Sequence, residues 1–436
     1  MDFMPFGHLV EVAHCSITNS DERGIETMNL EIHFQPVIIG TDLNAYGVAR
    51  TFHMAYGVVS KIFGNKKLLM VDHSKICDVT EVEGFTQDAV MVHTLIQYAK
   101  EHPEKKLILF AASEQYVFRI LSHYTALQDY YIIPYTKPEL GLLLSDKMNF
   151  YEYCETYQLA YPKALEIKRE TYEEFTTDLS FPLVLKPSES SDYFDLSFEG
   201  KEKAYILQDA SALKKALKDI YGHGYGHNMI LQEYVAGDVS NEYVMNVYAD
   251  QKGKVRLMSL GRILIEDPQP DMRGNYVAIV SPQKDPRVTK LYEDIKRFLE
   301  TIEFTGIANF DFKVDDKDGL FKVFEINMRQ GRSSFFSTLA GANLAVPIVE
   351  DLVFGKALEG TLYGADPFIW TNCFDKTFFR LVKTYQPALY DELISMENIG
   401  NTLFYAEDLS LRRKMLLNKY FKRYDERLSD FYKSRK

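Results

Sequence analysis

Apolar residues recur along this chain in two kinds of run, and their order predicts a mixed α/β protein. Over residues 33–145, short apolar strands at about 34–39, 67–72 and 106–113 alternate with helical stretches. Buried parallel strands appear as continuous apolar stretches, whereas helices repeat apolar residues every three or four positions. This alternation predicts a small parallel α/β domain with ligand-binding loops at the carboxyl ends of its strands.

The pattern changes at Ser145. A helix capped by Ser145 or Asp146 is expected to run to about Tyr157, and Pro162 leads into a strand. The later runs predict an α+β block with strands at 181–191, 228–238, 242–249, 255–265 and 274–280 and helices at 209–224 and 286–302. Residues beyond 360 are expected to form a largely helical appendix. We therefore expect domains at 1–32, 33–145, 146–240, 241–358 and 359–436.

The most informative segment is Gly306–Ser334. Two alternating runs, IANFDFKV and LFKVFEIN, flank the turn-rich DDKDG, which is typical of a β-hairpin. Side chains alternate faces along a strand, so Glu325 and Asn327 share one face. A turn centred near Asp318 would bring Asp311 opposite Glu325 on that face.

Two carboxylates and an amide oxygen are hard ligands that suit Mg²⁺, which usually keeps several waters and takes substrate phosphates as further ligands. Arg329 and Arg332 follow at once and would hold the same phosphates. A solvated hairpin with polar residues on its exposed face is the competing interpretation. The small-residue run QGRSS after Asn327 is loop material and favours a site. The segment is therefore a candidate nucleotide-metal site.

Composition narrows the class of protein. The 436 residues, 46% apolar and 26% charged, are typical of a globular protein of two to four units. No run reaches the roughly 18 apolar residues of a membrane span, and the N-terminus lacks the pattern of a signal peptide. A net charge of −12 disfavours a general nucleic-acid binder. Four cysteines without C-x-x-C spacing argue against a disulfide framework or a zinc site and indicate a reducing, cytoplasmic location.

The charge is uneven. Residues 411–436 contain ten Lys or Arg and three Asp or Glu, a balance of +7, with apolar residues at helical spacing. One interpretation is a surface helix drawn to anionic lipid, a peripheral membrane contact. The other is an amphipathic helix packed on its own domain with a solvated basic face.

Two lysines are candidate phosphate ligands. Lys186 ends an apolar strand just before Pro187 and a Ser/Glu turn, so its compact charge projects into a loop. Lys147 lies in the first turn of its helix, where the helix dipole disfavours a cation. Either Lys147 is an ordinary surface lysine or it reaches toward an anion.

The strand MILQEYVAGD is a candidate adenine-binding hinge. Its bend would present backbone N–H and C=O groups to an adenine edge, and the acid just past Gly237 is placed for ribose hydroxyls. An ordinary strand ending in a glycine turn is the competing interpretation. The candidates along this strand are Gln232, Glu233, Tyr234, Val235 and Asp238.

In order and rough spacing these elements resemble the ATP-grasp superfamily over about 210 residues. The matching positions are Lys147, Lys186, Gln232–Gly237, Asp311, Glu325, Asn327 and Arg329. The resemblance implies an ATP-grasp fold with a Rossmann-like N-terminal domain, and ATP with Mg²⁺, two ions for which Mn²⁺ substitutes. One departure is that SESSDYFDLSFEGKEKA replaces the family's glycine-rich phosphate lid, leaving Ser188, Ser190 and Ser191 as candidate donors.

A closer resemblance extends over nearly the whole chain from Val37. IIGTDLNAYGVAR, EDPQPDMRGNYV and FEINMRQGRSSFF are similar to the D-aspartate ligases of Gram-positive bacteria. That resemblance implies an ADP-forming ligase of peptidoglycan synthesis. It would join D-aspartate, through an acyl phosphate, to the lysine amine of UDP-MurNAc-pentapeptide.

The implied chemistry assigns further roles. Arg329, with Lys186, would stabilise charge at the reacting centre. Aspartate carries two carboxylates, so its pocket needs cations and donors; the candidates are Arg332, Ser333, Ser334, Asn275, Asp42 and Asn44. The sequence does not identify a base for the amine. Three alternatives stay open: a ligase of another acid and amine, a non-catalytic ATP-binding regulator, and a membrane adaptor that uses the basic tail.

Overall fold

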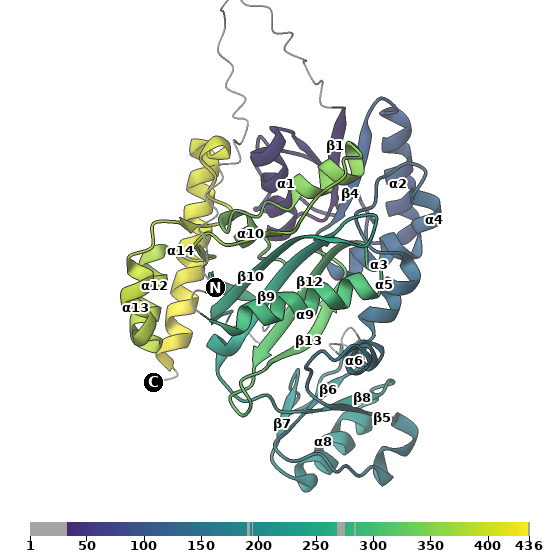
Figure 1. Ribbon diagram of the computed structural model, residues 1–436, viewed down its shortest axis with the longest axis vertical. Helices are drawn as coiled ribbons and strands as arrows, with labels where there is room; N and C mark the ends of the chain where they lie inside the picture. Colours follow the sequence, from purple (N-terminus) through teal and green to yellow (C-terminus); the bar gives the residue numbers. More distant parts are fainter. Residues whose placement is uncertain (1–32, 190–191, 194, 268–274, 283–284, 435–436) are drawn as a thin grey trace, which may run out of the picture. The chain divides into compact units, whose positions relative to one another are not determined.

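Residues 33–189, 192–193, 195–267, 275–282 and 285–434 are described in this computed structural model (Figure 1). Within them the strands form three sheets, of four, four and eight strands. The first sheet is parallel, and the second is antiparallel. The predicted combination of an α/β part with an α+β part is confirmed. The expected N-terminal extension, residues 1–32, lies outside the described residues.

The first sheet has the strand order β3–β2–β1–β4. Parallel neighbours need crossover connections, and helices supply most of them. The carboxyl ends of β1 and β4 are neighbours, because Ile39 pairs with Ala111. The elements of this part are β1 Phe34–Ile39, α1 Leu43–Tyr56, β2 Ser60–Gly64, β3 Cys77–Glu81, α2 Asp88–Glu101, β4 Lys106–Ala111, α3 Glu114–Ser122, α4 Tyr124–Leu127 and α5 Pro138–Ser145.

The strand predicted at 67–72 is wrong. That segment forms turns, and its Leu68 is 45% exposed. The neighbour of β1 is instead β2, whose five residues are all buried. The sequence conceals this strand because a lysine, Lys61, stands within it. Lys61 is nevertheless buried, and it forms an ion pair with Asp78 at 2.9 Å.

The second sheet, which we call the lid sheet, has the order β5–β8–β6–β7. It has its own hydrophobic core, in which Leu213 and Leu217 of α8 pack against Leu183 and Leu185 of β6. The elements are α6 Lys147–Thr156, β5 Ala164–Ile167, the 3₁₀ helix η1 Arg169–Glu174, β6 Leu183–Pro187, β7 Tyr205–Leu207, α8 Ala210–Gly222 and β8 Met229–Glu233. Asp146, not Ser145, caps α6, since its carboxylate accepts the N–H of Asn149 at 2.9 Å.

The large sheet has the order β13–β12–β9–β10–β11–β15–β16, with β14 beside β10. Registered partners share a face, so Tyr243 and Phe312 face one side and Val244 and Asp311 the other. Helix α9 covers the side of Tyr243 (Figure 1). The elements are η2 Val239–Asn241, β9 Glu242–Ala249, β10 Val255–Glu266, β11 Tyr276–Val280, α9 Arg287–Thr301, β12 Gly306–Val314 and β13 Phe321–Asn327.

The C-terminal part was expected to be largely helical, but it also completes the large sheet. Strand β15 pairs with β11, and the side chain of Trp370 in β15 is fully buried. The elements are α10 Phe335–Leu339, α11 Ala345–Ile348, the π helix η4 Val349–Val353, β14 Leu362–Tyr363, β15 Ile369–Thr371, α12 Asp375–Tyr385, α13 Pro387–Ile394, β16 Ile399–Gly400, the 3₁₀ helix η5 Ala406–Asp408 and α14 Leu411–Ser434.

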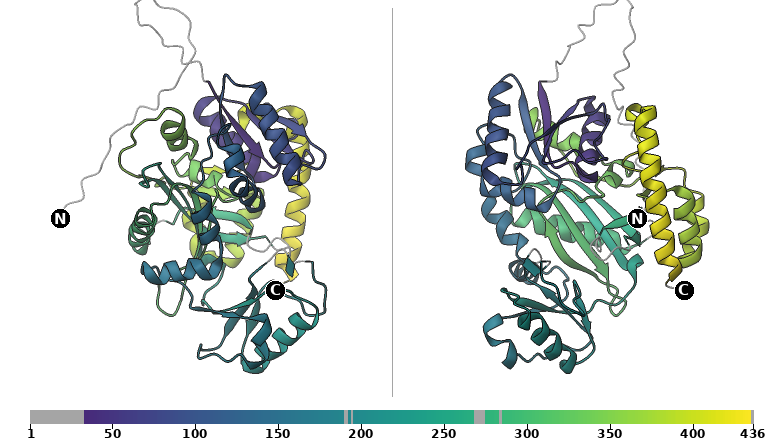
Figure 2. Two further views of the ribbon diagram at one scale, coloured as in Figure 1. Left: turned by 90° about the vertical axis from the view of Figure 1, so that its right-hand side faces the viewer. Right: turned by 180° about the vertical axis from the view of Figure 1, so that it is seen from behind.

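Helix α14 packs one face on the rest of the fold (Figure 2). Leu417, Phe421, Tyr424 and Leu428 are buried on that face. Arg413 joins them and donates to the carbonyl oxygens of residues 70 and 72 at 2.8 and 2.7 Å. The interpretation of the tail as a helix packed on its own domain therefore holds for one of its two faces.

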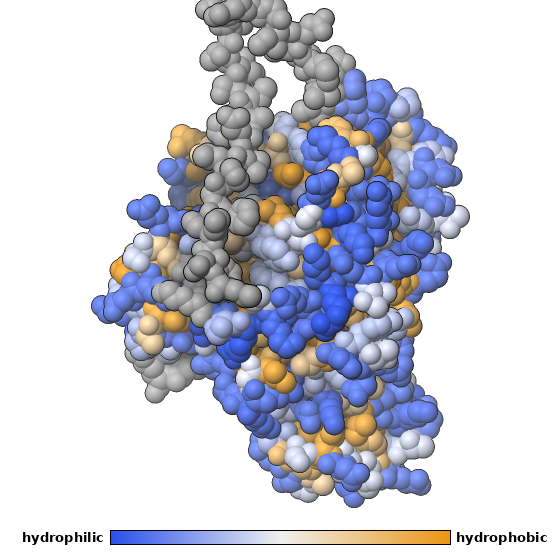
Figure 3. All heavy atoms as spheres, viewed as in Figure 1, coloured by the Kyte–Doolittle hydropathy of each residue, from blue (hydrophilic) through white to orange (hydrophobic). Residues whose placement is uncertain are grey.

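The surface and the helices also bear on the membrane. In the view of Figure 3, hydrophilic residues dominate the visible face and apolar ones occur in small groups. Among the described residues, every helix falls short of the length and apolar character that crossing a bilayer requires.

Candidate active site

The hairpin of β12 and β13 brings the predicted metal ligands together. Asp311 pairs with Glu325 and Asn309 with Asn327, as the alternation of the sequence predicts. The four side chains line one cavity of about 110 Å³. Its other lining residues are Val244, Asn275, Tyr276, Arg329, Gly331, Arg332 and Ser333.

Contacts between the three candidate ligands are close. The amide nitrogen of Asn327 lies 3.4 Å from Asp311 Oδ2 and 3.5 Å from Glu325 Oε1. A turn of this amide would point its oxygen, not its nitrogen, between the two carboxylates. The donor set therefore fits Mg²⁺, with two carboxylates, one amide oxygen and an open side for water and phosphate. Within the described residues no cluster of three or more His, Cys, Asp and Glu occurs, so a zinc-type site is not seen there.

The electrostatics of the two carboxylates differ. Burial and the nearby charge of Glu325 raise the pKa of Asp311, whose Oδ1 accepts the Tyr276 hydroxyl at 2.9 Å. Burial also opposes ionisation of Glu325, but the charges of Lys147, Lys186 and Arg329 outweigh it and lower the pKa of that carboxyl. The charge of Glu325 is thus balanced by two lysines and an arginine, whereas Asp311 has only Arg329 nearby, and a bound divalent ion would supply the missing positive charge.

Both candidate phosphate lysines reach this site from different elements. Lys147, the first residue of α6, places its Nζ 3.7 Å from Glu325 Oε2. Lys186, from the end of β6 in the lid sheet, lies near the same carboxylate, and burial together with Lys147 lowers its pKa to about 7. Two cations crowded in this way repel each other, and a bound polyanion would relieve that repulsion.

Tyr151 of α6 connects these parts, and sequence reasoning missed it. Its hydroxyl lies 3.0 Å from the carbonyl oxygen of Phe324 and 3.2 Å from Oε1 of Gln232, and it accepts from Lys186 Nζ at 3.4 Å. A β-bulge after Asp311 leaves Phe324 without a ladder partner, so its carbonyl is free for this contact. One hydroxyl therefore joins α6, the lid sheet and the metal hairpin.

The candidate adenine hinge follows β8. The side chain of Glu233 accepts the N–H of Lys163 at 3.0 Å, and Asp238 Oδ1 accepts the N–H and hydroxyl of Ser240, both at 2.7 Å. Tyr234 and Val235 lie between them, outside regular structure. Ser190 and Ser191, two of the candidate lid donors, lie outside the described residues.

The loop after β13 is fixed from two sides. Asn246 accepts the N–H of Gly331 at 3.0 Å, and Gln330 donates to Ala111 at 3.0 Å and to Asn44 at 3.3 Å. Gln330 and Asn246 escaped sequence reasoning because their partners are distant in the chain. These contacts tie the loop that carries the two arginines to the carboxyl ends of β1 and β4.

The two arginines differ in their partners. Arg329 donates to Asn327 Oδ1 at 3.3 Å, but its buried Nε has no partner among the described residues. Arg332 makes no hydrogen bond or ion pair with any of them, yet it lines the cavity. Its charge acts on Asp42 of the β1–α1 loop, whose pKa burial raises, and on Tyr420 of α14. A guanidinium group that faces a cavity with donors left over is suited to an anionic ligand.

The remaining substrate candidates divide into two groups. Asn275 and Ser333 line the cavity. Asn44 is 1% exposed, and its amide is occupied by Ala112 and Gln330, so it fixes the loop. Ser334 lines a separate small cavity between α1, α11 and β12. We therefore do not retain Asn44 and Ser334 as substrate contacts.

Glu114, the first residue of α3, is a further acid that sequence reasoning missed. Glu114 is exposed, but partial desolvation by its neighbours raises its pKa, while the charges of Arg329 and Lys147 lower it and that of Glu325 raises it. It makes no hydrogen bond or ion pair with another described residue. A carboxylate whose pKa responds to the charges of this site is a candidate base.

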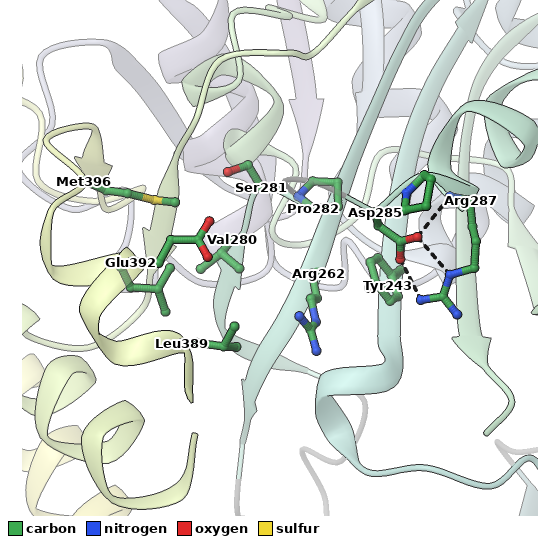
Figure 4. A pocket seen from close by; sticks show the side chains of 12 residues that line it. Tyr243, Arg262, Val280, Ser281, Pro282, Asp285, Arg287, Leu389, Glu392 and Met396 are labelled. Atoms are coloured by element: carbon green, nitrogen blue, oxygen red, sulfur yellow. Dashed lines mark hydrogen bonds and ion pairs between the residues drawn. The ribbon is translucent and has the colours of Figure 1, made fainter. Parts of the chain in front are cut away.

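Two larger cavities lie elsewhere. One, of about 350 Å³, is lined by Tyr243 and Arg262 on the face of the sheet away from Asp311 and by Leu389 and Met396 of the C-terminal part (Figure 4). Another, of about 500 Å³, is a mainly apolar cavity between α9 and the hairpin. None of the candidate catalytic, metal or nucleotide residues lines either one.

These elements define an ATP-grasp protein, and solved structures share its fold. They include biotin carboxylase of Campylobacter jejuni, with a TM-score of 0.58 and 15% identity, covering 76% of this chain and 73% of that one. N5-carboxyaminoimidazole synthetase of Staphylococcus aureus has a TM-score of 0.57 and 14% identity, and the match covers 82% of this chain and 87% of that one. L-amino acid ligase of Bacillus licheniformis has a TM-score of 0.53 and 15% identity, and the match covers 73% of this chain and 74% of that one. At such identities the likeness establishes the fold alone.

The sequence comparison is more specific. No protein-family model matches the chain. The D-aspartate ligase of Enterococcus faecium (strain Aus0004) is 39% identical over 411 residues, which cover 92% of this chain and 97% of that enzyme. The chain therefore belongs to the D-aspartate ligase family and is a ligase with the ATP-grasp fold.

Proposed function

We propose that this ligase joins D-aspartate to the lysine side-chain amine of UDP-MurNAc-pentapeptide, with ATP converted to ADP and phosphate. Membership of the D-aspartate ligase family carries the proposal. The site supports it, because Asp311, Glu325, Asn327 and Arg329 line one cavity. Lys147 and Lys186 lie close to the Glu325 carboxylate. Catalysis at such a site is chiefly positioning and charge stabilisation.

Nucleotide binding would use residues of α6, of the lid sheet and of the metal hairpin. Lys147 and Lys186 would hold the phosphates, and the hinge from Gln232 to Asp238 the nucleoside. A magnesium ion on Asp311, Glu325 and Asn327 would neutralise phosphate charge. A fold neighbour from Hydrogenobacter thermophilus was solved with MgADP. Two magnesium ions, and the use of Mn²⁺ in their place, remain predictions.

The first step forms an acyl phosphate. A carboxylate oxygen of aspartate attacks the γ-phosphorus of ATP, the bond from that phosphorus to the bridging oxygen breaks, and ADP leaves. Arg329 stands beside Asn327 with a free buried Nε, so it would stabilise the charge that develops. Arg332 would hold the second carboxylate of aspartate, and Asp42, opposite in charge, its ammonium group.

The second step forms the amide. The neutral acceptor amine attacks the acyl carbon, phosphate leaves with the bonding pair, and the nitrogen loses a proton. We assign that proton to Glu114. Glu114→Gln should slow amide formation about 100-fold, while ADP formation that depends on aspartate alone persists. Gln115→Glu, next to it on α3, is the matched control. Equal amide formation in Glu114→Gln and the wild type would remove Glu114 from the mechanism.

The test of the proposed function is phosphate release from Mg-ATP with a panel of D- and L-amino acids, with and without a lysine-containing muropeptide. We expect release that requires D-aspartate and rises when the muropeptide is added. Release with another acid would keep the ligase and discard the substrate. ATP binding without release for any pair would favour a regulatory protein.

One second candidate has a specific observation behind it. L-amino acid ligase of Bacillus licheniformis shares the fold, so a ligase that joins two free amino acids is the closest alternative. Amide formation with free amino acids in place of the muropeptide would favour it. A cytoplasmic location remains a prediction, based on the free, buried Cys77, Cys154 and Cys373.

A further inference from the structure

The outward face of α14 differs from the rest of the described surface. Leu411 and Met415, one helical turn apart, are 78% and 66% exposed, the two most exposed large apolar side chains in the described part of the chain. Arg412, Lys414, Lys419, Lys422 and Arg423 are exposed around them. We call these seven residues the basic face of α14.

The charges of the basic face are unpaired as far as the described residues show. None of its five cations makes a hydrogen bond through its side chain, or an ion pair, with another described residue. No acidic residue occurs from Leu411 to Tyr424. The first turn of α14 contains no acid although the positive end of the helix dipole lies there, so the cations add to that potential. The first acidic residues of the helix, Asp425 and Glu426, come only after this stretch, so its cations give the face a positive potential.

The face of α14 opposite the basic face packs on the rest of the fold. Arg413 lies among the cations in sequence, but it is buried and paired with Asp408 at 3.3 Å. The helix is thus fixed through its inner face, while its outer face is free. In Figure 2, seen from behind, α14 runs along the outside of the fold.

We propose that the basic face of α14 binds a membrane surface rich in anionic phospholipid. Apolar side chains on such a face enter the headgroup region, while Lys and Arg pair with lipid phosphates. The balance of residues 411–436, +7 within a chain of −12, leaves −19 for the rest, so the attraction to anionic lipid is concentrated in this segment while the remainder as a whole is repelled. A nucleic acid would use the cations but not Leu411 and Met415, which makes lipid the better match. The inference is independent of the proposed substrates.

The test is flotation of the full chain with vesicles of phosphatidylcholine alone or with about a third phosphatidylglycerol. We expect binding to the anionic vesicles, weakened by salt. Lys419→Glu with Lys422→Glu should weaken it at least tenfold, given roughly fivefold per cation. Lys215→Glu with Lys218→Glu, the same charge change on exposed positions of α8, is the matched control.

A second pair tests the apolar part. Leu411→Ser with Met415→Ser should weaken vesicle binding, whereas Ile206→Ser, at a 57% exposed position of the lid sheet, should not. Thermal unfolding should be unchanged in all variants. The proposal fails if neither vesicle binds, if both bind equally, or if the α8 variant loses as much as the α14 variant. It also fails if oligonucleotide binds and vesicles do not, or if the chain self-associates through α14 instead.

Discussion

Asp311 and Glu325 are both carboxylates of the proposed metal site, yet their surroundings shift their pKa values in opposite directions. They face each other across β12 and β13 with opposite pKa shifts, because only Glu325 has lysines beside it. Removing the charge of Glu325 would leave Lys147 and Lys186 without their counterion. It would also remove one of the oxygens proposed to bind magnesium.

Glu325→Gln should therefore lower phosphate release at least 100-fold while the fold stays intact. Steady-state kinetics and thermal unfolding measure the two effects. Glu359→Gln, at an exposed position, should behave as the wild type in both. Normal activity in Glu325→Gln would overturn the metal assignment.

Lys186 makes a prediction about pH. Burial together with Lys147 lowers its pKa to about 7, so in the free protein its ammonium form prevails below pH 7 and its neutral form above. Phosphate binding needs the charged form, so ATP affinity should fall as pH rises through 7, by up to about tenfold per pH unit.

The measurement is the ratio of ATP dissociation constants of the wild type and Lys186→Arg between pH 6 and 8.5. Arginine stays charged over this range, and the ratio cancels the titration of ATP itself. A ratio that does not change with pH would show that the Lys186 ammonium does not control nucleotide binding.

At the scale of elements, α6 links the lid sheet to the metal hairpin. Tyr151 is the contact, since its hydroxyl lies within hydrogen-bond distance of Phe324, Gln232 and Lys186. Without that hydroxyl, the lysine would lose an anchor and the bulge carbonyl its partner.

Tyr151→Phe should raise the KM for ATP about tenfold, in line with the roughly 1–3 kcal/mol of a lost buried hydrogen bond, and leave the KM for the acid unchanged. Tyr153→Phe, on the same helix, is the control. A change confined to the acid would show that Tyr151 acts on the other substrate.

The sequence was most informative where partners are close in the chain. The pairing of Asp311 with Glu325 followed from the hairpin pattern, since only a short turn separates the strands. Tyr151 and Gln330 were missed because their partners come from distant elements, and neither belongs to a motif. Strand β2 was missed because the lysine in its middle disguised a buried strand.

At the scale of the molecule, the C-terminal part is joined to the N-terminal sheet through a buried acid. Asp408 accepts from the hydroxyls of Tyr46 and Ser74 at 2.8 and 2.7 Å and pairs with Arg413 at 3.3 Å. Asp408 and Arg413 are close in sequence, but both are distant from Tyr46 and Ser74. The extension is thus locked to the first domain by charge as well as by packing.

Asp408→Ala should lower stability by about 3–5 kcal/mol, because it leaves a buried arginine without its counterion. The thermal unfolding midpoint measures this, with Glu407→Ala, at a 67% exposed side chain, as the control. Equal midpoints for Asp408→Ala and the wild type would show that packing alone holds the extension.

Trp370 gives this architecture an optical consequence. It is the single tryptophan of the chain, lies fully buried in β15, and donates from its indole N–H to Thr402 at 2.9 Å. Its fluorescence therefore comes from one place, the seam where the C-terminal part completes the large sheet. Detachment of that part would expose Trp370 to water and shift its emission to longer wavelength. The intrinsic fluorescence of the protein therefore reports whether the C-terminal part is attached to the large sheet.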